Sequence, residues 1–373
     1  MRDKTAVIKT DAVLGIFLLF FIFFPGMIQA QHEQKVEISE KAKAQAEEEI
    51  FHAGDMITEH VTDSYQWEII KIGKKHISIY LPVILYDRGE WHVFNSAKLY
   101  HGHDPYLGYS ICEEGANLGK IVRKNENGEE VLPDLDVSVT KNVLALIISS
   151  ALLIFIFISV AKSYKKRRGH APKGLQSFME PLILFVRDDI AIPSIGEKKY
   201  KRYLPFLLTI FFFILLNNLM GIIPFFPGGA NLTGNLAITG VLALFTFVIT
   251  TVSGNKNYWL HIINAPGVPW WLKFPVPLMP IVEILGMFTK PFVLMVRLFA
   301  NILAGHIVIL GFISLIFIFG AMNELLGYGV SIVSVGFTIF LDFLELLVAF
   351  IQAYVFTLLS ALYFGMATEE AHH

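Results

Sequence analysis

Long apolar runs dominate the second half of the chain, separated by short charged stretches. Three of these runs, at residues 143–161, 203–223 and 236–253, have the length of one membrane-crossing helix, about 20 residues. Two later runs, at residues 275–319 and 327–364, are about twice as long. A helix over the first of these two would extend roughly 65 Å, so it must be strongly tilted, broken or folded into a hairpin. The pattern predicts an all-α polytopic membrane protein with about five membrane helices.

Residues 31–140 are polar and form a compositional block of their own. Between residues 67 and 111, short pieces rich in β-branched and aromatic residues alternate with turn residues. We therefore expect a small N-terminal domain of β or mixed structure, followed by a membrane domain at residues 141–373.

The first 30 residues have the layout of a secretory signal peptide. Basic residues precede a short apolar run at residues 12–24, and small residues follow up to Ala30. We expect cleavage after Ala30, with an uncleaved signal anchor as the alternative.

Clusters of basic residues predict the orientation of the chain in the membrane. Lys162, Lys165 and Lys166 follow the first apolar run directly, and such residues remain in the cytoplasm. Residues 31–140 are then extracytoplasmic, and five spans bring the C-terminus to the cytoplasmic side. Residues 172–192 alternate apolar and charged positions around Pro181, which predicts a segment lying on the cytoplasmic membrane surface.

Composition narrows the functional classes. The chain has 373 residues, of which 54% are hydrophobic and 17% charged, with a mean hydropathy of +0.56. These values exclude a typical soluble enzyme, and a net charge of −2 gives no support to nucleic-acid binding. The single cysteine, Cys112, excludes an intramolecular disulfide. His101 and His103 could ligate a metal, but a solvated loop explains them better, so we expect no metal and no cofactor.

Arg297 stands inside the apolar run at residues 275–319, although an arginine at the bilayer centre costs roughly 2.5–3.5 kcal/mol. It therefore needs a partner, a cavity or an ion path. Guanidinium does not release its proton, but it can hold a carboxylate in its charged form. The alternative is an arginine paired with an internal acid to fix helix packing. Asn301, four residues later, shares its helix face.

The sequence KPFVLMVRLFANILAGH, residues 290–306, resembles the signature helix of subunit a of F-type ATP synthases, which carries an R-L-F-x-N-x-x-A-G pattern. The resemblance covers roughly residues 141–373. It implies two long, steeply tilted C-terminal helices beside a rotor ring, in the stator of a rotary motor of the bacterial inner membrane.

The resemblance also implies partners and roles. The partners are the ring of c subunits, the peripheral stalk subunit b, the remaining ATP synthase subunits and the lipid bilayer. Two aqueous half-channels lead protons to and from the ring carboxylates, and Arg297 separates them. Whether the ion is H⁺ or Na⁺ stays open, because the ion site belongs to the ring.

Further positions match the pattern of this family. Asn301 follows the arginine by one turn, and Glu283 matches an acid of the cytoplasmic release path. Gln352 matches a glutamine that packs near the arginine, and Asn218 matches an asparagine lining the channel through which protons enter.

His306 and Glu345 are exchanged relative to many bacterial members, which have glutamate at the first position and histidine at the second. This exchange suggests that the two side chains meet in space, although Asp342 is a possible alternative partner. Gly221 and Gly234 stand where many members carry acids, which leaves the detailed inward route open.

Two other functions compete with this reading. A proton-coupled secondary transporter would also bury charged residues, but it would normally show more spans and internal repeats. An intramembrane enzyme would need a motif such as H-E-x-x-H or G-x-S-x-G, and the chain contains neither.

Overall fold

The computed structural model describes residues 54, 57, 62–72, 75–100, 105–112, 117–125, 128–167, 170–223, 226–263 and 278–369. The signal-peptide prediction therefore lies outside the described residues. Among the residues described, five helices are long and apolar enough to cross a membrane. The prediction of an all-α membrane part preceded by a small β-rich part is confirmed.

The N-terminal part consists of short antiparallel sheets. Strands β1 (Gln66–Ile72) and β2 (Lys75–Tyr80) form a hairpin. A second sheet has the order β4-β3-β8, and a third has the order β5-β6-β7. These strands are β3 (Pro82–Asp87), β4 (Glu90–Asn95), β5 (Tyr109–Ile111), β6 (Ile121–Lys124), β7 (Glu130–Val131) and β8 (Leu135–Asp136), and the short helix α3 (Ala97–Tyr100) follows β4.

Alternation along β3 buries Val83, Leu85 and Asp87 on one face, as the two-residue period of a strand requires. The buried face also contains a polar link. Tyr109 donates a hydrogen bond to Asp87 (3.0 Å), and Arg123 pairs with the same carboxylate (2.8 Å). Burial, together with the bond to Asp87, raises the pKa of Tyr109 to about 12. The domain thus has a small core of its own.

The membrane part begins with α4 (Lys141–Lys166). The cytoplasmic surface segment predicted around Pro181 forms α5 (Leu175–Phe185), a π-helical turn (Val186–Ala191) and α6 (Ile192–Ile195), and Pro181 is accommodated inside α5. Next come α7 (Tyr200–Ile222), α8 (Leu236–Ser253) and the short α9 (Lys256–Ile263). The main apolar core joins residues of α4, α5, α7, α10 and α11.

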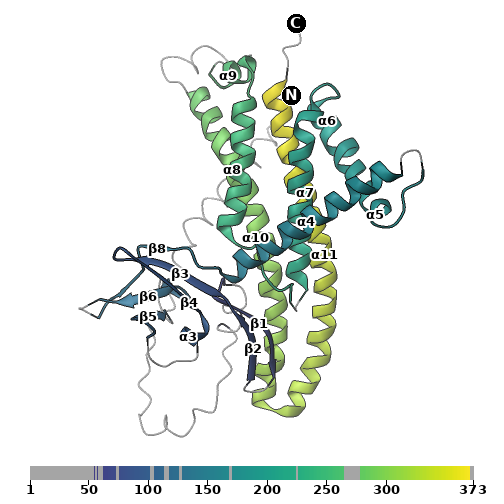
Figure 1. The fold of residues 1–373 in the computed structure, drawn as a ribbon. Helices are drawn as coiled ribbons and strands as arrows, with labels where there is room; N and C mark the ends of the chain where they lie inside the picture. Colours follow the sequence, from purple (N-terminus) through teal and green to yellow (C-terminus); the bar gives the residue numbers. More distant parts are fainter. Residues whose placement is uncertain are drawn as a thin grey trace, which may run out of the picture. The chain divides into compact units, whose positions relative to one another are not determined.

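The two longest helices are α10 (Leu278–Met322) and α11 (Glu324–Thr368), with 45 residues each. Of the three possibilities for the first long run, a break and an internal hairpin are therefore excluded. The helices lie side by side (Figure 1) and are joined at Asn323, whose side chain accepts a hydrogen bond from the Leu325 amide (2.8 Å). Gly320 and Gly327 allow the backbones to approach closely there, because a Cβ on Gly327 would lie 2.7 Å from the Gly320 Cα.

Candidate functional site

His306 and Glu345 meet between α10 and α11. Nδ1 of His306 lies 2.5 Å from Oε1 of Glu345, and the two side chains are only 9% and 6% exposed. The two atoms lie within ion-pair distance, and the contact is a salt bridge when the imidazole is protonated. The expectation that the two side chains meet is confirmed. Asp342, the alternative partner, is half-buried and lies within electrostatic reach of both groups.

Two glycines border this pair. A Cβ on Gly305 would lie 3.1 Å from Oε1 of Glu345, so the glycine lets the carboxylate come close to the α10 backbone. A Cβ on Gly221 would lie 3.7 Å from Nε2 of His306, at ordinary contact distance. The space beside His306 is therefore bordered by the backbone of α7, where many members of the resembled family place an acid.

Gly234, the second glycine at such a position, lies in the loop between α7 and α8. Its amide donates a hydrogen bond to Oδ1 of Asn231 (2.9 Å), and a side chain at this position would overlap Asn231. An acid at residue 234 would therefore require the Asn231 side chain to move.

Asn218 ties three elements together and is 2% exposed. Its Nδ2 donates to the carbonyl of Ala349 on α11 (3.1 Å), and its Oδ1 accepts from Thr233 of the α7–α8 loop (2.6 Å). Both ends of the amide are thus fixed. Sequence reasoning missed Thr233, because nothing in the linear pattern joins a loop threonine to a helix asparagine 15 residues earlier.

Gln352 is buried on α11, 6% exposed, two turns beyond Glu345 on the same face. The buried polar side chains His306, Glu345, Gln352 and Asn218 therefore come from α10, α11 and α7. Ionisable side chains inside membrane helices commonly face a partner, the bundle interior or a water-filled cavity.

Arg297 and Asn301 have the opposite environment. Both are exposed, while Leu294, Leu298 and Ile302 of the same helix are buried in the core. Within the described part of the chain, Arg297 forms no hydrogen bond or ion pair. The alternative of an arginine paired with an internal acid is therefore not supported, and the guanidinium is free to meet a partner outside this chain.

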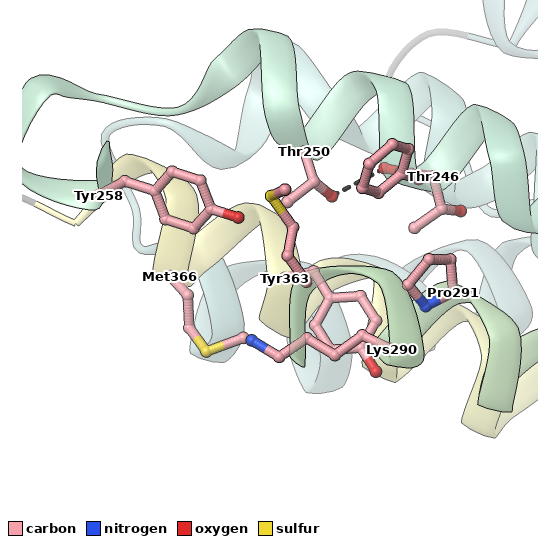
Figure 2. A pocket seen from close by; sticks show the side chains of 9 residues that line it. Thr246, Thr250, Tyr258, Lys290, Pro291, Tyr363 and Met366 are labelled. Carbon is pink, nitrogen blue, oxygen red and sulfur yellow. Dashed lines mark hydrogen bonds between the residues drawn. The ribbon is translucent and has the colours of Figure 1, made fainter. Parts of the chain in front are cut away.

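A second polar region lies towards the start of α10. A cavity of about 20 Å³, large enough for one water, is bordered by side chains from α8, α9, α10 and α11, among them Thr250, Tyr258, Lys290 and Tyr363 (Figure 2). The Lys290 Nζ lies 5.7 Å from the centre of the Tyr363 ring. Tyr363 is in turn within electrostatic reach of Arg297.

Glu283, near the start of α10, is half-buried and lies within electrostatic reach of Tyr258. Burial, and secondarily the charge of Glu283, raises the pKa of Tyr258. Sequence reasoning selected Glu283 but not Tyr258, because the short helix α9 carries no recognisable motif. The structure brings Tyr258 and Glu283 together from separate helices.

Among the described residues, no group of three or more His, Cys, Asp or Glu side chains is arranged to hold a metal ion. The sequence candidates His101 and His103 lie outside these residues.

Comparisons with known proteins divide the chain at the start of α4. Residues 56–143 match a family described as a domain of unknown function, DUF8433. Residues 143–365 match the family described as ATP synthase A chain. The five long helices and all seven site residues selected from the sequence lie almost wholly in this second part.

Individual relatives agree. ATP synthase subunit a of Chloroherpeton thalassium is 45% identical over 244 residues, which is 64% of this chain and 69% of that protein. ATP synthase subunit a of Myxococcus xanthus is 45% identical over 263 residues, covering 67% of this chain and 81% of the relative. ATP synthase subunit a 2 of Prosthecochloris aestuarii is 45% identical over 258 residues, covering 66% and 75%. The chain is a multi-pass membrane protein that belongs to the ATP synthase subunit a family.

Proposed function

We propose that this chain forms the stationary side of the proton path in the membrane sector of an F-type ATP synthase. The observation that carries the proposal is the division of polar residues in the α10–α11 hairpin. The His306–Glu345 pair is buried inside the bundle, whereas Arg297 is exposed and unpaired among the described residues on the same helix α10.

The buried group is suited to take up protons. An imidazole and a carboxyl group can each bind and release a proton, so His306 can pass a proton to the Glu345 carboxylate in contact with it. Asn218 and Gln352 add amide groups that can hold water along the way. In this proposal the four side chains line the half-channel through which protons enter.

The exposed arginine is suited to separate that half-channel from the next. It keeps its charge at every working pH and attracts a deprotonated carboxylate presented by a neighbouring ring of c subunits. Asn301 lies one turn away on the same exposed face. The residues between and after them, Ala300 and Ala304, are also exposed and are small enough for another helix to pack closely.

Release of the proton is assigned to the second polar region. Tyr258 and Tyr363 line a cavity that can hold one water. Glu283 is within electrostatic reach of Tyr258, and Arg297 is within electrostatic reach of Tyr363. In this proposal a proton leaving a ring carboxylate beside the arginine passes along these groups. This part of the proposal places Glu283 in the half-channel that opens to the cytoplasm.

The remaining partners follow from membership of the complex. The exposed face of α5, with Leu175, Phe178 and Leu184, and the outer surface of α4 are available to the peripheral stalk subunit b and to the other ATP synthase subunits. The proposed location is the bacterial inner membrane, with residues 1–30 acting as signal peptide, residues 31–140 outside the cytoplasm, residues 141–373 forming the membrane domain, and the C-terminus in the cytoplasm.

The orientation can be tested with reporters. Gly128 lies in an exposed turn between β6 and β7, so a reporter inserted there should not disturb the domain core. A reporter active only outside the cytoplasm is expected to give a signal at this position, because the basic residues after the first span remain inside. A signal from a cytoplasm-only reporter at the same position would reverse the whole topology.

The proton path can be tested by neutralising Glu345. In membrane vesicles stripped of the nucleotide-binding subunits, Glu345→Gln is expected to lower passive proton flux at least about tenfold, equivalent to ~1.4 kcal/mol in the barrier. The amide keeps the shape of the side chain but cannot take up and release a proton. The matched control is Glu324→Gln at the exposed start of the same helix, which should conduct normally. Equal flux in the two variants would remove Glu345 from the path.

A further inference from the structure

Trp67 is one of the residues through which the N-terminal domain contacts the membrane domain. Trp67 of β1 is 2% exposed and clusters with Ala145 of α4 and Ala230 of the α7–α8 loop. Its ring meets Phe226 of the same loop edge-on, with 5.1 Å between the ring centroids and an interplanar angle of 70°. Edge-to-face contacts of this kind are favourable beyond the area that they bury. The two small alanines leave the space that the indole fills.

The start of β1 is fastened to the first membrane helix. The backbone amide of Asn142 donates to Oδ1 of Asp63 (3.0 Å), and the amide of Lys141 donates to the carbonyl of Ser64 (2.8 Å). A carboxylate at the N-terminus of α4 receives amide hydrogen atoms that have no partner within the helix. Trp67, three residues beyond Ser64, is therefore held in a fixed position beside α4.

The loop that Trp67 contacts is folded back onto the end of α7. The amide of Gly229 donates to the carbonyl of Met220 (3.1 Å), and the Thr233 hydroxyl donates to Asn218 (2.6 Å). The loop therefore has two polar attachments to the turns of α7 that carry the proposed proton path.

The same loop reaches Gly221, beside which His306 also lies. The Ala230 carbonyl lies 3.8 Å from the position that a Cβ would occupy on Gly221, and Nε2 of His306 lies 3.7 Å from that position. Ala230 thus clusters with Trp67, and its carbonyl and the imidazole both lie near Gly221. A shift of the loop would change the surroundings of Gly221, where the imidazole lies.

We propose that the N-terminal domain acts as a clamp on the proton path, with Trp67 as its contact. Trp67 is a positioning residue that holds loop 226–235 where Thr233 orients Asn218 and the Ala230 carbonyl lies beside Gly221, near which His306 also lies. The inference rests on the proposed function of Asn218 and His306. It gives a role to the region that matches a domain of unknown function and that the subunit a family match does not cover.

The test uses the complete ATP synthase in membrane vesicles. Trp67→Ala is expected to lower proton-driven ATP synthesis about tenfold, within the range produced by a small displacement of positioning groups. Trp67→Phe, which keeps an aromatic ring against Phe226, should restore most of the rate. The matched control is Trp91→Ala in the same domain, because Trp91 is 60% exposed and outside this cluster. It should leave synthesis unchanged.

A second readout follows the loop itself. Hydrogen exchange of residues 226–235 in the intact complex should accelerate in Trp67→Ala and stay unchanged in Trp91→Ala. Phe226→Ala removes the same contact from the loop side and should accelerate exchange and slow synthesis in the same way, without touching the domain core. If Trp67→Ala fails to assemble, the Phe226→Ala variant provides the test instead. Native synthesis in Phe226→Ala, or slow synthesis with unchanged loop exchange, would overturn the clamp.

The clamp and the proposed function fail in different ways. Faster hydrogen exchange of the loop in Trp67→Ala, together with normal proton flux in Glu345→Gln, would contradict the proposed proton path but support the contact of Trp67 with the loop. Impaired flux in Glu345→Gln, together with native exchange and native synthesis in both clamp variants, would remove the clamp alone.

Discussion

Replacing Arg297 by alanine is expected to abolish proton-driven ATP synthesis and to make the membrane sector leak protons. The arginine is exposed and unpaired within the described part of the chain, so its removal should leave the fold of this chain intact. Without the fixed positive charge, nothing holds a ring carboxylate in its ionised form or separates the two half-channels. We expect synthesis to fall at least about 100-fold, equivalent to ~2.7 kcal/mol. Passive proton flux in stripped vesicles should rise.

The variant Arg297→Lys tests whether the positive charge alone is sufficient or whether the planar shape of the guanidinium is also needed. The ammonium keeps the positive charge but lacks the planar fork with five donors, so synthesis should still fail while the leak stays small. The control is Arg187→Ala, which removes an exposed arginine whose salt bridge is to its neighbour Asp188. That variant should synthesise ATP at the native rate. Near-native synthesis in Arg297→Lys would show that a bare positive charge is sufficient and would contradict the role given to the guanidinium.

Changing His306 or Glu345, the buried pair, is expected to have the second largest effect on ATP synthesis. His306→Glu places two carboxyl groups in one buried space, and Glu345→His places two imidazoles there. Because like groups raise the cost of ionising either one, each single variant should slow synthesis by about tenfold or more. The double exchange restores one acid beside one base at the 2.5 Å contact and should recover much of the rate.

The measurement is a double-mutant cycle on proton-driven ATP synthesis. Recovery in the double variant above the worse single variant indicates coupling. Asp342→Asn serves as the comparison, because Asp342 lies near the pair without contacting it in the way Glu345 does, and we expect a smaller loss. If the two single losses simply add, the residues act independently despite their contact.

Much of the fold could be predicted because hydropathy reports directly on membrane helices. The third span was placed at residues 236–253, which are the bounds of α8. The continuity of α10 could not be predicted, since a run of twice the membrane thickness permits a tilted helix or a hairpin equally well. Which of the two forms depends on tertiary packing against α11. The same packing allows Pro291 to stand inside α10.

The site was predictable where a pattern marks it and not elsewhere. Arg297, Asn301 and His306 stand in one recognisable segment, and the exchange of His306 with Glu345 indicated their contact. Trp67 and Thr233 carry no such mark. Their contacts depend on how loop 226–235 packs against β1 and the end of α7, which joins residues far apart in sequence.

The unbroken length of α10 and α11 also fixes how this chain can touch a moving neighbour. A helix of 45 residues is about 68 Å long, so it stays within a 30 Å hydrocarbon core only at a tilt of roughly 64°. Such a tilt spreads it over about 60 Å in the plane of the membrane. Since packed helices stand about 10 Å apart, this span equals the width of roughly six packed helices, so the hairpin is long enough to contact more than one helix of a curved ring at a time. A ring turning past the hairpin would lose one helix contact at one edge as it gains another at the opposite edge. The area of contact between the ring and the hairpin would therefore stay nearly constant during rotation.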